Sequence, residues 1–136
     1  MKNDLVRIIE KVGGKAQFNL VEEQGENVIS FSKSIDGKEY TFFLIYAKES
    51  TMLVVNLIHT FSTQYENMEA DFYEVISKLN GNCIHGYLGF IKEEKTQIAY
   101  KSSYIGDFVN LEGNKSFEYF FQVSFDMVDY FDSQLS

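Results

Sequence analysis

The sequence predicts an α+β domain in which helices pack on an antiparallel β-sheet. Apolar residues recur with helical spacing in three stretches, near the start, in the middle and near the end of the chain. The stretches between them are rich in Val, Ile, Phe, Tyr and Thr, and short polar turns of the kind that join antiparallel neighbours separate them. Helices and strands are therefore grouped and not strictly alternating. We expect one domain over residues 1–136 with the order α-β-β-β-β-α-β-β-α.

The first helix is expected to begin at Asn3 or Asp4, either of which can cap its first turn. The pair Gly13-Gly14 can end it, because glycine tolerates the left-handed conformation in which many helices stop. Its buried face consists of four apolar residues with the spacing i, i+3, i+4 and i+7: Leu5, Ile8, Ile9 and Val12.

Four strands are expected next, as a meander. They cover residues 18–22, 27–32, 38–46 and 51–59. The runs TFFLIY at 41–46 and MLVVNLI at 52–58 are more apolar than a sheet with one wet face requires. Either a second subunit or a bound peptide covers the other face, or the three helices wrap more of the sheet than a two-layer arrangement suggests.

A second helix is expected over residues 64–80. Thr63 and Glu66 have the spacing of a capping box, and Gly81 can end the helix. Two further strands, at 84–91 and 96–104, are joined by a polar turn at 92–95, and an aromatic-rich helix closes the fold.

Charge and composition exclude several classes of protein. The chain has 12 Lys and Arg against 20 Asp and Glu, a net charge of −8, so we expect no nucleic-acid partner. The longest mostly apolar run, residues 52–61, is too short to span a membrane, and the first residues lack the pattern of a signal peptide. We therefore expect a soluble, cytoplasmic protein without membrane contact. The single cysteine, Cys83, argues against an internal disulfide or a multi-thiolate metal site, and we expect no cofactor and no metal.

Nearly the whole chain, from the first helix and the meander onward, resembles a known family. The segment YENMEADFYEVISKLN runs into GNCIHGYLGFIKEEKTQIAYKSSYIGDFVNLEG and an aromatic closing helix, and this order resembles the YbjN-like domain family. Leu79-Asn80 and residues 86–89 lie where that family has an asparagine-containing turn followed by a strand that opens small-aromatic-apolar. The resemblance implies a fold like that of the class I type III secretion chaperones. It also implies an acidic, usually dimeric protein that binds other proteins and has no known catalytic machinery.

Few side chains are candidates for chemistry. On a strand, Cys83 and His85 would face the same side and could pair as nucleophile and base, although a small buried cysteine is the commoner role. His59 stands alone at the end of an apolar strand, where we expect a structural histidine. The acids of the second helix spread around its surface and form no evident metal site.

The last helix carries two apolar stripes. At about 100° per residue, Tyr119, Val123 and Tyr130 gather on a second arc, and Asp126, Asp129 and Asp132 occupy much of the remaining surface. The second stripe either packs under the sheet edge or the loop at 106–114, or it forms a dimer contact or a groove for a partner segment. The first arc is expected in the core: Phe117, Phe120, Phe121, Phe125, Val128, Phe131 and Leu135.

The leading hypothesis is a non-enzymatic protein-binding domain, chaperone-like or regulatory. It would use this acidic and aromatic surface, with Tyr119, Val123 and Tyr130, to bind apolar or basic segments of a partner protein or a second copy in a homodimer. Two alternatives stay open. The first is an acidic immunity-type protein that neutralises a basic toxin, and the second is a small-ligand or enzymatic module that uses Cys83 and His85.

Overall fold

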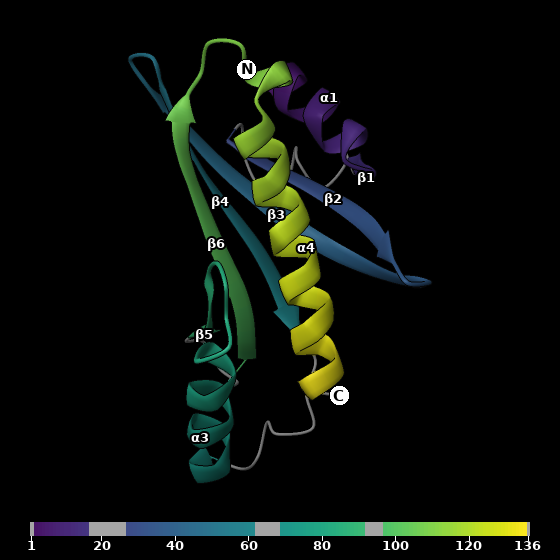
Figure 1. Ribbon diagram of the computed structural model, residues 1–136, viewed down its shortest axis with the longest axis vertical. Coiled ribbons are helices and arrows are strands. Elements are labelled where there is room, and N and C mark those ends of the chain that lie inside the picture. Colours follow the sequence, from purple (N-terminus) through teal and green to yellow (C-terminus); the bar gives the residue numbers. More distant parts are fainter. Residues whose placement is uncertain (1, 17–26, 62–68, 92–96, 136) are drawn as a thin grey trace.

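The computed structural model describes residues 2–16, 27–61, 69–91 and 97–135. Six antiparallel strands form one sheet in the order β1-β2-β3-β4-β6-β5, and α4 lies across one face of it (Figure 1). The elements along the chain are α1 Lys2–Lys11, β1 Gly14–Ala16, β2 Val28–Ile35, β3 Lys38–Glu49, β4 Met52–Phe61, α3 Glu69–Asn80, β5 Tyr87–Ile91, β6 Gln97–Asp107, the 3-10 turn η1 Leu111–Gly113, and α4 Lys115–Leu135.

The predicted α+β class and element order are confirmed, and several boundaries differ. The helix α1 already begins at Lys2, so Asn3 and Asp4 lie inside its first turn and do not cap it. Gly13 adopts a φ of 91° just after the helix, as expected of a glycine that ends it. The predicted strand at 18–22, the capping pair at 63 and 66 and the turn at 92–95 lie outside the described residues.

The first strand that the structure describes is β1, which pairs with the end of β2. The strand β2 continues to Ile35, so the turn to β3 contains only Asp36 and Gly37. Their φ angles of 49° and 83° are those of a two-residue hairpin turn, which favours Asp-Gly because both residues need positive φ. The hairpin β2–β3 is therefore longer than the sequence predicted.

The core lies between the sheet and α4. Phe31 and Phe42 stack at a ring distance of 5.2 Å, and Phe125 packs 5.2 Å from Phe42. Burying one such side chain contributes about 1.5–3 kcal/mol. All members of the predicted first arc are buried: Phe117, Phe120, Phe121, Phe125, Val128, Phe131 and Leu135.

Side-chain hydrogen bonds fix both ends of α4 to the sheet. At the start, the Asn114 side chain accepts a bond from the Phe117 amide (3.2 Å) and donates one to the Tyr104 hydroxyl (2.9 Å). Near the end, the buried Tyr40 hydroxyl lies 3.0 Å from Asp129 Oδ1 and 3.1 Å from Asp132 Oδ2. These bonds set the position of the whole helix, including the side that faces away from the core.

The opposite face of the sheet is apolar in places, as the two strand sequences predicted. Burial alternates along β3 and β4, with one set of side chains under α4 and the other on the far face. On that far face Ile45 is 40% exposed, Met52 42% and Ile105 67%. The helices α1 and α4 therefore share one face, and the structure leaves these three side chains of the other face open.

Candidate functional site

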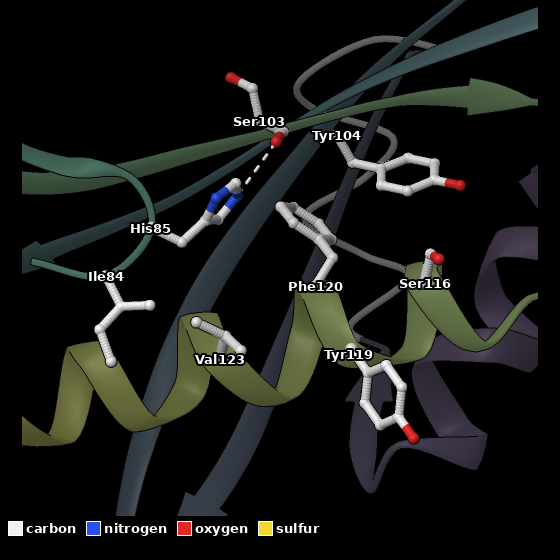
Figure 2. A pocket seen from close by; sticks show the side chains of 8 residues that line it. All are labelled: Ile84, His85, Ser103, Tyr104, Ser116, Tyr119, Phe120 and Val123. Carbon is white, nitrogen blue, oxygen red and sulfur yellow. Dashed lines mark hydrogen bonds between the residues drawn. The ribbon is translucent and has the colours of Figure 1, made fainter.

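Two adjoining hollows border α4 where it passes the turn at residues 81–86. The first has a volume of about 370 Å³, and Figure 2 shows its lining of Ile84, His85, Ser103, Tyr104, Ser116, Tyr119, Phe120 and Val123. The second has a volume of about 360 Å³ and is lined by Asn82, Ile84, Val123, Asp126, Met127 and Tyr130. Because Ile84 and Val123 line both, we call the two hollows together the α4 groove.

The three residues predicted for partner contact all line this groove. Tyr119 is 65% exposed and its ring points away from the sheet (Figure 2), whereas Val123 and Tyr130 are half-buried. The second stripe thus faces the turn at 81–86, and Tyr119 is not covered by the loop at 106–114. Whether the stripe binds a partner stays a prediction.

The acidic edge of the groove is smaller than the sequence suggested. Asp126 is the one carboxylate among the residues that line the two hollows. Asp129 and Asp132 lie on the side of α4 that meets β3, where they bind the Tyr40 hydroxyl, and Lys38 forms an ion pair with Asp132 at 3.1 Å. The prediction that all three acids edge the stripe was therefore wrong for two of them, because β3 supplies partners on their side of the helix.

An asparagine holds the turn at residues 81–86 in place. The Asn80 side chain accepts a hydrogen bond from the Leu88 amide (2.7 Å) and donates one to the Leu88 carbonyl (3.0 Å), so it pairs with β5 as a neighbouring strand would. Gly86 has a φ of 83°, and a Cβ at this position would come within 2.5 Å of the Lys101 carbonyl oxygen. The Tyr100 hydroxyl donates to the His85 carbonyl. These contacts hold the turn against β6 and place Ile84 opposite α4.

Cys83 and His85 do not form the predicted pair. They lie in the turn and not on a strand, because β5 begins only at Tyr87. The Cys83 thiol donates to the backbone carbonyls of His85 and Gly86, each at 3.2 Å, and burial raises its pKa. The His85 ring instead faces the groove, with Nε2 3.1 Å from the Ser103 carbonyl and its edge on Phe120 at 5.7 Å. The thiol and the imidazole thus each bond to a backbone carbonyl, and no bond joins the two side chains in the described contacts.

His59 is buried where two strands separate. The ladder between β3 and β4 ends at the pair Phe43 and Ile58, and His59 Nδ1 lies 2.7 Å from the Thr41 carbonyl, to which it donates. Its ring packs against Phe61 at 4.7 Å. Burial lowers the pKa of His59 and so favours the neutral ring. The bond to Thr41 and the charge of Asp132 act in the opposite direction and offset part of this shift. This is the structural histidine that the sequence predicted.

The remaining features of the surface offer less chemistry. A third hollow of about 670 Å³ lies between α1 and residues 108–113, and there Arg7 already binds Glu112 at 2.6 Å and also pairs with Asp4. Within the described ranges, no group of three or more His, Cys, Asp or Glu residues could hold a metal ion. No helix in the part of the chain that the structure describes is long and apolar enough to cross a membrane.

No protein-family model, no characterised protein and no solved structure matches this chain. The resemblance to the YbjN-like family therefore stays a prediction, and the groove is interpreted from its own chemistry. Ile84, which is 84% exposed, was not predicted as a groove residue because the sequence placed it at the start of a strand. The only signal for a turn was its position among Gly81, Asn82 and Gly86.

Proposed function

We propose that this chain is a non-enzymatic protein-binding domain that holds an apolar segment of a partner protein in the α4 groove. One observation carries the proposal. Ile84 and Tyr119, 84% and 65% exposed, flank a hollow whose deeper lining is aromatic and aliphatic. Exposed apolar side chains that gather around a concave surface are typical of protein interfaces.

The lining also favours a particular kind of partner. It offers polar side chains at Asn82 and Ser116, the backbone of Ser103, one carboxylate at Asp126, and no Lys or Arg. The whole chain carries a net charge of −8. A partner segment with apolar side chains and a flanking basic residue fits this lining, and the overall charge raises the rate at which basic proteins approach.

The test compares two variants, each with two exposed apolar side chains replaced by serine. Ile84→Ser with Tyr119→Ser removes the exposed rim of the groove, whereas Met52→Ser with Val109→Ser removes exposed apolar side chains that do not line it. Each chain is used for affinity capture from a native cell lysate at low and high salt. We expect proteins that the wild type and the control retain and that the groove variant loses.

Two results would contradict the proposal. Capture of the same proteins by the groove variant would place their binding elsewhere on the surface. A wild-type chain that is dimeric by light scattering, with a monomeric groove variant, would show that a second copy occupies the groove. Both variants are expected to stay folded, because substitutions at exposed positions change the free energy of unfolding by about 0.5 kcal/mol or less.

A further inference from the structure

The strand β6 is longer than the strand beside it. The strand β4 pairs with β6 from Ile98 to Asp107, but β5 pairs only with residues 97–101. Figure 1 shows β5 and α3 beside the first part of β6 and no strand beside the rest on that side. Among the strands that the structure describes, residues 103–107 of β6 thus have a neighbour on the β4 side alone.

The backbone groups of this stretch that face outward can be assigned from the register. Leu88 directs its amide and carbonyl to Asn80, away from β6, so its partner Tyr100 bonds to β4. Alternation then directs the amides and carbonyls of Ser103, Ile105 and Asp107 to the open side. Among the described residues one side chain reaches this edge: His85 Nε2 donates to the Ser103 carbonyl (Figure 2).

The first hollow of the α4 groove lies along the same edge. Ser103 and Tyr104 line it from β6, and Tyr119 and Phe120 line it from α4. In the paired part of the sheet, Leu88 sits opposite Tyr100 and is only 2% exposed. A strand that continued the line of β5 would place an inward side chain opposite Tyr104, which lines this hollow. The hollow is the space that a longer β5 would fill.

We propose that an extended segment of the partner protein adds to the sheet at residues 103–107 of β6 and buries an apolar side chain in the first hollow. This inference rests on the proposed function and specifies how the groove is used. The segment's backbone bonds to Ser103, Ile105 and Asp107, and one of its amides replaces the His85 imidazole at the Ser103 carbonyl. The carboxylates of Asp107 and Asp126 favour a basic residue at its ends.

A foreign segment fits this edge better than a second copy does. Two copies that paired through β6 would bring together chains of net charge −8 each. The side chains on the inward face of the second β6 include Tyr104, which is held by Asn114 and by ring contacts to Phe117 and Phe120 of its own α4. They are not available to fill the hollow of a neighbour.

Proline at residue 105 tests the edge selectively. Ile105→Pro removes the amide that points to the open side and costs no bond to β4, whereas Ile105→Ala removes the side chain and keeps that amide. The probes are peptides selected on the full wild-type chain from a phage-displayed library of random twelve-residue sequences. We expect them to bind wild type and Ile105→Ala about equally, and Ile105→Pro at least about tenfold more weakly. Fluorescence anisotropy measures the affinities.

Hydrogen exchange supplies an internal comparison. On binding, exchange of the Ile105 amide should slow, whereas that of Tyr104, which bonds to β4, should change little. If Ile105→Pro fails to fold, N-methylated peptides replace it. Methylation at the positions that face β6 should abolish binding, and methylation at the alternate positions should not.

The outcomes separate this inference from the proposed function. Peptides that bind Ile105→Pro as tightly as wild type, yet lose affinity for the Ile84→Ser, Tyr119→Ser variant, would overturn strand addition and leave the proposed function standing. A selection that enriches no peptide, or only peptides insensitive to both variants, would overturn both. A wild-type dimer that Ile105→Pro alone makes monomeric would assign the edge to a second copy and overturn the partner segment.

Discussion

Asn80→Ala should destabilise the protein and loosen the groove at the same time. The Asn80 amide group satisfies both backbone groups of Leu88 on the side of β5 that faces away from β6, at 2.7 and 3.0 Å. Leu88 is 2% exposed, so its amide and carbonyl depend on this side chain. The same pair of bonds fixes the two ends of the turn that carries Ile84 and His85.

The size of the effect follows from the two bonds. Leaving one buried donor or acceptor without a partner costs about 1–3 kcal/mol. Because Asn80 itself is half-buried, water can reach part of the vacated space, and the lower half of that range applies. For the two bonds together we therefore expect the free energy of unfolding to fall by about 2–4 kcal/mol, a large share of the usual 5–15 kcal/mol for a domain.

Urea denaturation measures this loss, with Asn82→Ala as the matched control. Asn82 is an exposed asparagine in the same turn, so its replacement should cost about 0.5 kcal/mol or less. Asn80→Asp should fall between the two, because it keeps the acceptor for the Leu88 amide and loses the donor to the carbonyl. A cost for Asn80→Ala equal to that of Asn82→Ala would refute the view that this side chain closes the edge of β5.

Two further outcomes concern titratable side chains. Because burial lowers the pKa of His59 below its ordinary 6.5, the unfolded chain binds a proton first as the pH falls. The free energy of unfolding should therefore decrease below about pH 6.5, and less so in His59→Gln, when urea denaturation is repeated between pH 7.5 and 5. Burial raises the pKa of Cys83, so iodoacetamide at pH 8 should alkylate it at least about tenfold more slowly than a free thiol. Equal rates would contradict the bonds assigned to its thiol.

The elements that could be predicted from the sequence are those whose signal is local. The buried arc of α4 follows from the spacing of its aromatic residues, because each turn of the helix returns a side chain to the same face. The second stripe with Tyr119, Val123 and Tyr130 follows from the same arithmetic. For both, the helix alone decides which side chains share a face, and the structure adds only what lies opposite.

The groove itself depends on contacts between distant segments. The strand β5 starts at Tyr87 and not at residue 84 because the Lys101 carbonyl approaches Gly86, which local sequence does not reveal. Asp129 and Asp132 face away from the groove because they meet Tyr40, about ninety residues earlier in the chain. Spacing along one helix cannot identify a partner on a strand, so the extent of the acidic edge was overestimated.

The position of α4 in the chain has a consequence for synthesis. The face that it covers includes Phe31, Phe42, Leu44, Leu53 and Leu57, all with no measurable exposure, and these residues belong to strands that end by Phe61. The covering helix begins only at Lys115. A ribosome must therefore add more than fifty residues after the central hairpins are complete before their apolar face can be closed. During that interval the apolar face of the nascent sheet is exposed to solvent. Aggregation with other chains is therefore most favoured at this stage of synthesis.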